Sequence, residues 1–452
     1  MLSQLFKNIP RLKWTVTVIL TVVLAGCVKH DPFPHSSASD ENANVIYDWY
    51  KLISRLQLNQ NPQPVVLQNI RNFGFIGVGL YESVQPGIKG GVSLSHKLYQ
   101  MPGMPQPIED KQYLWGASAN AYLPSIMKQI LTGLTDANKA SMDSLEEAYY
   151  NRFKQRTSDA VALRSAEFGK AIANSIYTWS TTDKFTLSAD GYTLPVCPSC
   201  WVLIAPAQAA VGPFLGESRP FLEYSLTAVA PPLPVPYSED PSSGFYKEAK
   251  NVYDIGNTLT DEQKVIPRWW ADVGGTGVGL ASGAHIFSIV IDVLQSKNVK
   301  LAKAAEIFAK TSIAIKDAGV IVWRSKFDPK FNLLRPQTYI NRHIDPEKDW
   351  ASFLGNPPYP DYLSGLVSLY ASSMQVLKRE YGDIPITDKA YVWRGSGTRE
   401  YDSISDLVVE AGFSRVLAGI HYQFTQDVTI RETGKLGDKI ADLDLVTGHW
   451  DY

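Results

Sequence analysis

Apolar residues recur at helical spacing along residues 301–323, and this pattern constrains the fold more than any other feature of the chain. Side chains three or four positions apart lie on one face of an α-helix, so such a stripe marks a helix whose apolar face packs against a core. The stripe consists of Leu301, Ala304, Ala305, Phe308, Ser312, Ile315, Gly319 and Val322. Because no proline interrupts it, the segment predicts one long helix of a mostly helical protein.

Similar patterns on both sides of this segment predict a protein that is almost wholly α-helical. Alternating patterns typical of strands are short and isolated, which argues against a large sheet. The last expected helix begins near Thr425, where Thr, Gln and Asp follow one another and suit a helix cap. We therefore expect packed helical bundles in one domain over residues 43–452. The other expected helices cover residues 46–57, 63–85, 113–132, 136–151, 157–179, 281–296, 362–380, 404–413 and 426–442.

Residues 183–245 interrupt the helical pattern with many prolines. Proline lacks a backbone N–H donor and breaks helices, so this segment predicts irregular chain. A long irregular segment within a compact helical protein usually has a function at the surface. We expect it to form a lid or rim.

Cys197 and Cys200 lie within the Pro-rich segment in a C-x-x-C arrangement. In an exported chain, two cysteines at this spacing most simply form a local disulfide. Free thiols, a metal site or a redox role remain alternatives. A metal would need two more ligands, which no nearby His or Cys supplies, and a redox pair would favour a helix N-terminus in a βαβ unit.

The N-terminus has the pattern of a bacterial lipoprotein signal peptide over residues 1–27. Basic residues precede a short apolar run, residues 14–24, which is shorter than the ~20 residues that a bilayer requires. The run ends in Leu-Ala-Gly-Cys, so we expect Cys27 to carry the lipid. Residues 28–42 predict a flexible tether. We therefore expect a domain outside the cytoplasm, anchored to the inner or outer membrane of a Gram-negative-type cell envelope.

The charge balance argues against nucleic acid as a partner. Lys and Arg total 43 and Asp and Glu total 45, and no basic stripe with interleaved aromatic residues occurs. Apolar residues make up 45% of the chain and charged residues 19%, which is typical of a well-buried globular protein.

Arg335, Arg415 and His421 have side chains that together suit a tetrahedral or trigonal oxyanion. Guanidinium groups offer fixed N–H donors and stay charged, and a histidine beside them can attack or ligate the central atom. Ser364 and Gly365 fall at the start of the expected helix 362–380, where unpaired backbone N–H groups favour an anion. These residues predict an oxyanion site built from several helices.

The order and spacing of these residues resemble the superfamily of type 2 phosphatidic acid phosphatases and vanadium haloperoxidases. Its pattern is Lys-x6-Arg-Pro, then Pro-Ser-Gly-His, then Ser-Arg-x5-His-x3-Asp. The resemblance is most detailed over residues 262–343, which look like the haloperoxidase branch, and extends more loosely over residues 45–445. It implies an all-α fold of packed bundles, with the Pro-rich segment over the site entrance. It also implies a catalytic His421, which would ligate vanadate if that cofactor binds, and an oxyanion held by Lys326, Arg335, Ser364, Gly365 and Arg415.

The lysine of the first motif is displaced by an insertion. Counting seven residues back from Arg335 gives Asp328, with Lys326 and Lys330 on either side. The segment that begins at Trp323 matches the usual Trp-x-x-Lys, which favours Lys326. Lys330 remains the alternative.

Two replacements affect the chemistry that the resemblance implies. Leu366 stands where the family has the second-motif histidine, and Thr425 stands where it has an aspartate after the third-motif histidine. Leucine cannot donate a proton, and general acid catalysis is typically worth a factor of ~10²–10⁴. Asp427 could partly substitute as a partner of His421. Two further histidines are candidate auxiliaries: His343 as a substitute proton donor or a surface residue, and His285 as a residue of the site or of the core.

Two classes of function follow from the resemblance. The first is an exported, lipid-anchored enzyme that hydrolyses phosphomonoesters or, with vanadate bound through His421, oxidises halide with peroxide. The second is a degenerate member that keeps an oxyanion pocket for binding or for a role in the cell envelope. Leu366 and Thr425 favour the second class. The first is favoured by the joint presence of Arg335, Ser364, Gly365, Arg415 and His421.

Overall fold

The computed structural model describes residues 36–58, 60, 65–275 and 279–447. The predicted signal peptide, Cys27 and residues 28–35 of the predicted tether lie outside the described residues.

The described chain is mostly helical, and the predicted all-α fold is confirmed. The N-terminal half contains α1 (Asn44–Leu58), α2 (Val66–Val84), α3 (Trp115–Ile130), α4 (Asp136–Lys154) and α5 (Asp159–Ser180). The C-terminal half contains α9 (Ser282–Ser296), α10 (Leu301–Phe327), α12 (Gly365–Tyr381), α13 (Ile404–Leu417) and α14 (Gln423–Ala441). Shorter helices connect them: α6 (Ser225–Ala228), α7 (Gly244–Thr258), α8 (Asp261–Trp269) and α11 (Pro336–His343).

The strands of the described residues form only two small antiparallel ladders. One pairs β1 (Val273–Gly275) with β2 (Gly279–Ala281), and the other pairs β3 (Ile386–Asp388) with β4 (Arg399–Tyr401). Single-turn 3-10 helices occupy Gln85–Gly87, Leu94–His96, Leu215–Glu217 and Val392–Arg394.

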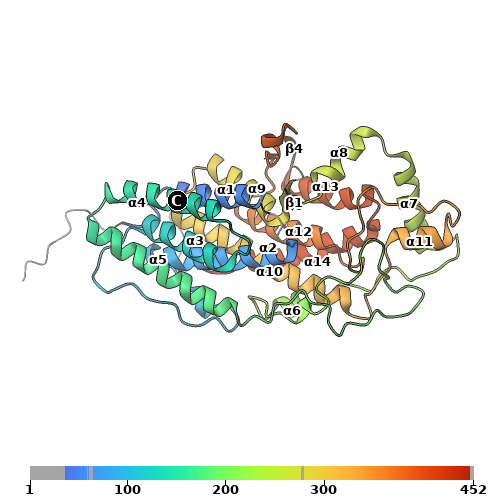
Figure 1. Ribbon diagram of the computed structural model, residues 1–452, viewed down its shortest axis with the longest axis horizontal. Helices are drawn as coiled ribbons and strands as arrows, with labels where there is room; N and C mark the ends of the chain where they lie inside the picture. Colours follow the sequence, from blue (N-terminus) through green and yellow to red (C-terminus); the bar gives the residue numbers. More distant parts are fainter. Residues whose placement is uncertain (1–35, 59, 61–64, 276–278, 448–452) are drawn as a thin grey trace, which may run out of the picture.

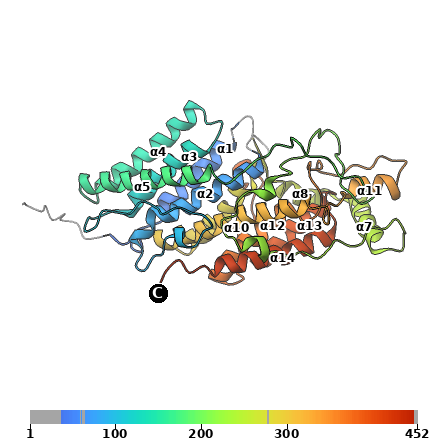
Figure 2. The same ribbon diagram turned by 90° about the horizontal axis from the view of Figure 1, so that it is seen from below.

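The molecule is elongated, with two groups of helices arranged along its length (Figure 1). Helices α3, α4 and α5 lie towards one end, and α12, α13 and α14 lie in the other half (Figure 2). Helix α10 joins the groups because it packs against α2 on one side and against α12 on another.

Helix α10 is buried over almost its whole circumference, which explains why it lies between the two groups. Its charged residues have partners: Lys310 pairs with Glu306 at 2.8 Å, and the Asp317 carboxylate accepts the backbone N–H of Phe221 at 2.6 Å. Helix α2 approaches closely because Gly77 faces Ser312, where a Cβ atom would collide with the serine hydroxyl.

The structure departs from the expected elements at several places. Helix α14 begins at Gln423, so Thr425 lies in its first turn instead of acting as the cap. Helices α7, α8 and α11 were not expected. Residues 36–42, which the sequence assigns to the tether, are packed: Ala38 and Glu41 are buried, and the Glu41 carboxylate accepts the backbone N–H groups of Trp115 and Gly116 at the start of α3.

The Pro-rich segment 183–245 is irregular apart from the 3-10 turn Leu215–Glu217, α6 and the first residues of α7. It runs along α10, where the Trp323 indole donates to the carbonyl of Val211 at 3.1 Å and the Lys316 ammonium donates to the carbonyl of Arg219 at 2.6 Å. The backbone N–H of Val211 in turn donates to the carbonyl of Pro358 at 3.0 Å. One part of the segment therefore touches the loop before α12, which carries residues of the candidate site.

None of the helices within the described ranges has the length and apolar character needed to cross a bilayer.

Candidate oxyanion site

The candidate site residues come from the ends of four helices in the C-terminal half. Lys326 lies in the last turn of α10, Arg335 is the N-cap of α11, and Ser364 is the N-cap of α12. Arg415 lies in the last turn of α13. A turn at Gly419, which has a positive φ of 77°, then leads into His421 just before α14. The local sequence favours these positions because proline follows Arg335 at the first helical residue and glycine permits the left-handed turn.

Lys326 is the lysine that reaches the site. Its side chain is fully buried, and its ammonium donates to the carbonyls of Pro360 at 2.7 Å and Asp361 at 2.9 Å. Lys330 is exposed in the turn after α10.

Arg335 is fully buried and contacts the same loop. Its Nε donates to the carbonyl of Tyr359 at 2.9 Å, and Nη2 lies 3.4 Å from the carbonyl of Pro360. Its Nη1 donates to the carbonyl of Ile420 at 2.7 Å and lies 3.5 Å from Nε2 of His421. The guanidinium therefore connects the loop before α12 to the segment before α14.

His421 is held by a carboxylate that the sequence analysis did not select. Its Nδ1 lies 2.8 Å from Oδ1 of Asp361, and both side chains are buried. A carboxylate accepts and does not donate, so Nδ1 carries the proton and Nε2 keeps its lone pair towards Arg335. Burial lowers the pKa of His421 to about 3, with Arg335 and Lys326 adding to the effect, although Asp361 opposes it. The imidazole is therefore neutral at ordinary pH.

The expected auxiliary role of Asp427 is not supported by its position. Asp427 is exposed, and its carboxylate accepts a hydrogen bond from the Gln423 side chain at 2.8 Å. Thr425, in contrast, donates to Oδ2 of Asp361 at 2.5 Å. The signal for Asp361 was its place beside Ser364 and Gly365 in the motif segment, as an ionisable residue next to the expected anion-binding turn.

The start of α12 differs in part from the expectation. The backbone N–H of Ser364 is not available to an anion, because it donates to the hydroxyl of Thr429 at 2.9 Å. The Ser364 hydroxyl is buried and has no hydrogen-bond partner within the described chain. Gly365 packs against the ring of Trp323 and lines a cavity.

Arg415 lies on that cavity from the side of α13. Its Nη1 donates to the carbonyl of Trp270 at 3.0 Å, whereas its buried Nε has no partner among the described residues. Burial lowers the pKa of Arg415, and the pKa of Arg335 falls to about 10 for the same reason. The pKa of Lys326 lies well below its ordinary value, again through burial and then through Arg335. Burial is thus the main cause of all three shifts, and Asp361 opposes it in part at Lys326 and Arg335.

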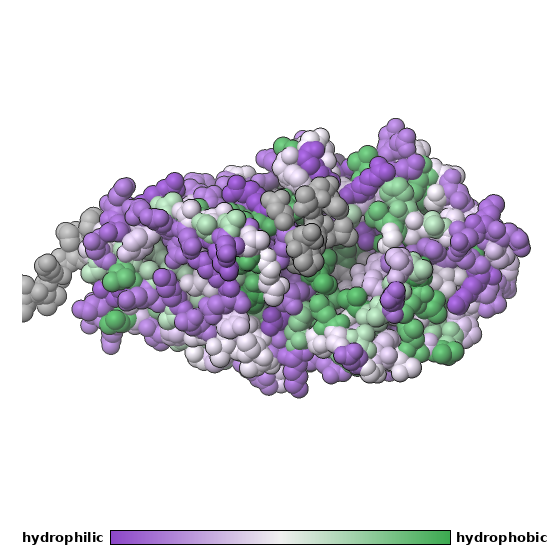
Figure 3. All heavy atoms as spheres, viewed as in Figure 1, coloured by the Kyte–Doolittle hydropathy of each residue, from purple (hydrophilic) through white to green (hydrophobic). Residues whose placement is uncertain are grey.

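The cavity has a volume of about 980 Å³ and mostly apolar walls. Figure 3 shows apolar residues around a hollow near the middle of the molecule. Leu366 lines the wall beside Gly365, so the residue in the second-motif histidine position does face this space. The lining includes Ile70, Val211, Trp269, Trp323, Leu354, Pro358, Tyr359, Gly365, Leu366, Leu369 and Arg415.

Lys326, Arg335 and His421 are not part of the cavity lining. Tyr359 contacts both groups: it lines the cavity, and the Lys326 and Arg335 head groups each lie 5.1 Å from the centre of its ring. The expected Lys326, Arg335 and His421 therefore form an inner cluster together with Asp361, which was not expected, and Gly365 and Arg415 belong to an outer wall. Tyr359 lies at their boundary and was not predicted from the sequence.

His343 and His285 lie outside the inner cluster. His343, the last residue of α11, lies 3.1 Å from the hydroxyl of Tyr237 in the Pro-rich segment. This contact does not place it as a substitute proton donor for His421. His285 is fully buried, with Nδ1 2.8 Å from Asp272 and Nε2 2.8 Å from Asp388. Burial lowers its pKa, but the two carboxylates outweigh this effect and raise the value to about 10. Of these residues only Asp272 lines the cavity.

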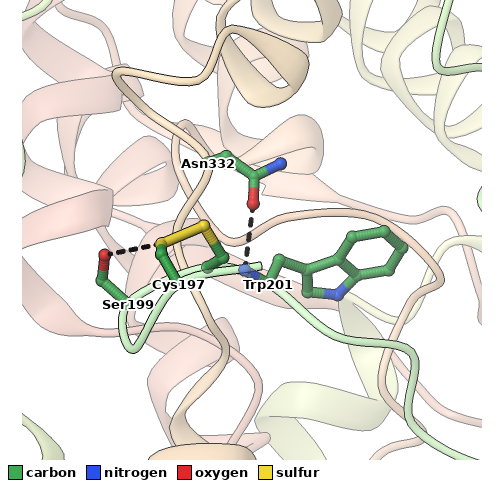
Figure 4. The surroundings of a disulfide bond; sticks show 5 residues. Cys197, Ser199, Trp201 and Asn332 are labelled. Carbon is green, nitrogen blue, oxygen red and sulfur yellow. Dashed lines mark hydrogen bonds between the residues drawn. A yellow bond between two sulfur atoms is a disulfide. The ribbon is translucent and has the colours of Figure 1, made fainter. Parts of the chain in front are cut away.

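Cys197 and Cys200 form a disulfide in the Pro-rich segment, and the turn that it closes touches the segment before Arg335 (Figure 4). The backbone N–H of Trp201 donates to the side-chain oxygen of Asn332 at 2.9 Å. The backbone N–H of Leu334 donates to the carbonyl of Ser199 at 2.8 Å. The disulfide turn therefore supports the residues that lead into Arg335.

Comparisons with known proteins agree with this geometry. A family model described as the VCPO second helical-bundle domain matches residues 306–447, which include every residue of the inner cluster. A vanadium chloroperoxidase of Curvularia inaequalis is 23% identical over 197 residues, covering 31% of this chain and about a third (32%) of the relative.

Solved structures match over nearly the whole chain. The structure of a bacterial vanadium-dependent iodoperoxidase has a TM-score of 0.79 and 26% identity, covering 90% of this chain and 98% of that one. The holo form of a bacterial vanadium-dependent chloroperoxidase has a TM-score of 0.65 at 16% identity and covers 89% of this chain and 97% of that one.

Proposed function

We propose that this chain, which belongs to the superfamily of vanadium haloperoxidases and type 2 phosphatidic acid phosphatases, binds vanadate at His421. With vanadate bound, it would act as a vanadate-dependent peroxidase. The proposed substrates are hydrogen peroxide and a halide, with iodide the first to test because it is the most easily oxidised of the common halides. A relative with that named activity matches the whole fold at 26% identity.

The observation that carries this proposal is the state of His421. Its Nδ1 proton is bound to Asp361, and burial keeps the ring neutral, so the Nε2 lone pair is available to a ligand beside Arg335. A neutral histidine with its second nitrogen fixed by a carboxylate is the usual form of a metal-ligating imidazole.

The residues around His421 fit an oxyanion. In the described chain, Lys326 and Arg415 donate hydrogen bonds only to backbone carbonyls. The three shortest hydrogen bonds of Arg335 also go to backbone carbonyls. None of these three buried basic side chains is therefore hydrogen-bonded to a carboxylate within the described residues. The Ser364 hydroxyl and Nε of Arg415 are buried without a partner in the same part of the chain. Buried polar groups normally find partners, and an anion would supply them.

Vanadate, when bound, would supply the Lewis-acidic centre that activates peroxide towards halide. The chain itself contributes the Nε2 ligand of His421 and the positive charge of Lys326, Arg335 and Arg415. These side chains are buried, and electrostatic interactions are stronger away from bulk water. Leu366 contributes no proton, so proton transfer to peroxide depends on solvent or on the reactants.

Phosphate ester hydrolysis is the second candidate, because phosphate has the same tetrahedral shape as vanadate. His421 would attack phosphorus through Nε2. Since Leu366 cannot protonate a leaving group, this reaction is restricted to esters with acidic leaving groups, such as aryl phosphates.

The test measures vanadate binding by calorimetry and iodide oxidation by absorbance, with the full chain in detergent. We expect His421→Ala to abolish turnover, and Arg335→Ala and Arg415→Ala each to weaken vanadate binding by roughly 10- to 100-fold, since each removes charge-assisted hydrogen bonds. Arg379→Ala, at an exposed position on α12, is the matched control and should bind normally.

The contrary results have distinct meanings. Aryl phosphate turnover without iodide oxidation would replace the peroxidase with the hydrolase. Vanadate binding without either reaction would leave a binding protein, the alternative that Leu366 and Thr425 favour. Unchanged binding in both arginine variants would contradict the proposed site itself.

We also propose that the protein is an exported lipoprotein anchored through Cys27 in the cell envelope of a Gram-negative-type bacterium. The proposal is supported by residues 1–27, in which basic residues are followed by a short apolar run and then by a lipobox that ends in Cys27. Cys27→Ala should move the protein from the detergent phase to the aqueous phase in a Triton X-114 separation. Wild-type protein in the aqueous phase would contradict the anchor.

A further inference from the structure

Asp361 joins two residues through its two carboxylate oxygens. Oδ1 lies 2.8 Å from Nδ1 of His421, and Oδ2 accepts the hydroxyl of Thr425 at 2.5 Å. All three side chains are buried, at 0%, 3% and 0% exposure for Asp361, His421 and Thr425. Thr425 is the residue that replaces the family's aspartate four positions after the third-motif histidine.

The backbone of Asp361 is fixed on both sides of this carboxylate. Its N–H donates to the carbonyl of Leu333 at 2.9 Å, and its carbonyl accepts the Lys326 ammonium at 2.9 Å. The position of the carboxylate is therefore set by the segment before Arg335 and by α10. Because the backbone of Asp361 is already fixed, its carboxylate can orient His421 at a small cost in conformational entropy.

We propose that Asp361 is the positioning residue of His421 and takes over the function of the missing aspartate at position 425, with Thr425 acting as its anchor. The inference deepens the proposed function, because it concerns the residue that would ligate vanadate. In this chain the carboxylate lies in the loop that precedes α12 instead of at position 425 on α14, and it contacts Nδ1 of His421.

The arrangement explains why the threonine does not leave the histidine unsupported. The Thr425 hydroxyl donates a hydrogen bond to Oδ2 of Asp361, while Oδ1 faces Nδ1 of His421. Thr425 is itself held in α14, where its carbonyl accepts the hydroxyl of Thr429 at 2.6 Å. Thr429 in turn accepts the N–H of Ser364. One chain of hydrogen bonds thus links His421 to the start of α12.

The test moves the carboxylate back. Asp361→Ala removes the partner of Nδ1, and we expect vanadate affinity to fall by roughly 10- to 100-fold, the usual cost of losing a group that orients a ligand. Thr425→Asp in the Asp361→Ala background should recover most of the loss, because it restores a carboxylate four residues after His421. Thr425→Asp alone should weaken binding, because it buries two carboxylates next to each other. Asp427→Asn is the exposed control and should bind as wild type does.

A second measurement does not depend on vanadate or turnover. Histidine-selective ¹⁵N NMR, with His421 assigned by the spectrum of His421→Gln, reports which ring nitrogen carries the proton. Wild type and the double variant should show a single tautomer protonated at Nδ1, and Asp361→Ala should show mixed tautomers. If vanadate never binds but these spectra behave as described, the proposed function fails and the positioning role stands.

Two outcomes would overturn the inference. The first is an unchanged His421 tautomer in a folded Asp361→Ala variant. The second is a loss of tautomer order that Thr425→Asp does not restore in the double variant. If Asp361→Ala does not fold, as judged by circular dichroism, Thr425→Val tests the anchor: it removes the hydroxyl that holds Oδ2 of Asp361, and an unchanged spectrum and vanadate affinity would exclude Thr425 as the anchor of Asp361.

Discussion

Leu366 stands at the position where the family pattern has its second histidine. It lies at the second residue of α12 and lines the cavity beside Gly365 and Arg415. An isobutyl group at this position provides an apolar wall and cannot donate a proton.

Leu366→His should restore the missing acid. The new imidazole faces the cavity, so we expect hydrolysis of an alkyl phosphate by the vanadate-free protein to rise by about 10²-fold, the lower bound for a general acid. Hydrolysis of an aryl phosphate, which needs less protonation, should change much less. Rates are measured with both esters in wild type and variant.

Leu369→His is the matched control, because it places an imidazole on the same cavity wall one turn further along α12. Equal rate increases in both variants would mean that position 366 has no special relation to the leaving group. No increase in either would contradict the assignment of Leu366 to the position of the acid.

The sequence brought Lys326, Arg335 and His421 into one predicted site, but it did not predict how they are paired. The Trp-x-x-Lys pattern favoured Lys326 over Lys330, and the structure buries Lys326 at the end of α10 and exposes Lys330. Asp361 was passed over because a hydrogen bond between residues sixty positions apart depends on how the loop before α12 packs against α14. Spacing along the chain carries no information on that contact.

At the scale of elements, the long apolar helices were predictable, whereas several shorter helices were not. Helices α2 and α10 bury nearly every side chain, so their sequences are long and rich in apolar residues. Helix α7 buries only Phe245, Ala249 and Val252, and its stripe was missed because the helix begins inside the Pro-rich segment. Helix α8 contains a proline but starts with a capping box formed by Thr260 and Gln263, a local signal that could have revealed it.

The loop before α12 is the element that organises the site. Its carbonyls at residues 359–361 receive the donors of Lys326 and Arg335, and its side chains supply Tyr359 and Asp361. The segment before Arg335 is hydrogen-bonded to this loop through Leu333 and Asp361. The disulfide turn contacts the same segment at Asn332 and Leu334. Such irregular segments take their shape from tertiary contacts, so their location could be predicted from the sequence but their conformation could not.

At the scale of the whole molecule, a buried charge cluster lies at the junction of the two groups of helices. His285 is in α9, which packs against α1, α2 and α12, and its carboxylate partners Asp272 and Asp388 belong to the segments of the two small ladders. The cluster also receives the hydroxyls of Tyr370 and Tyr391 through Asp272. An imidazolium between two carboxylates fixes several elements that have few other contacts in common.

This cluster predicts a pH-dependent contribution to stability. The pKa of His285 is about 10 in the folded protein and about 6.5 when unfolded, so its contribution is complete below pH 6.5 and is lost as the pH rises towards 10. Lys316, whose pKa burial lowers to about 8, acts in the opposite direction above that pH. The two effects are separated by comparing wild type with Asp388→Asn, since both proteins contain Lys316.

Asp388→Asn removes one of the two carboxylates that hold the His285 proton, so the pKa of the histidine should fall in the variant. Wild type should then be more stable near pH 6.5, and its advantage in unfolding free energy should shrink by up to about 1.4 kcal/mol per pH unit between pH 7 and 9. Urea unfolding followed by circular dichroism at several pH values measures this difference. Asp159→Asn, at an exposed position on α5, should show a difference from wild type that does not vary over the same range. A stability difference for Asp388→Asn that stays constant with pH would mean that His285 is neutral, and that hydrogen bonds without a buried cation hold the two groups of helices at this junction.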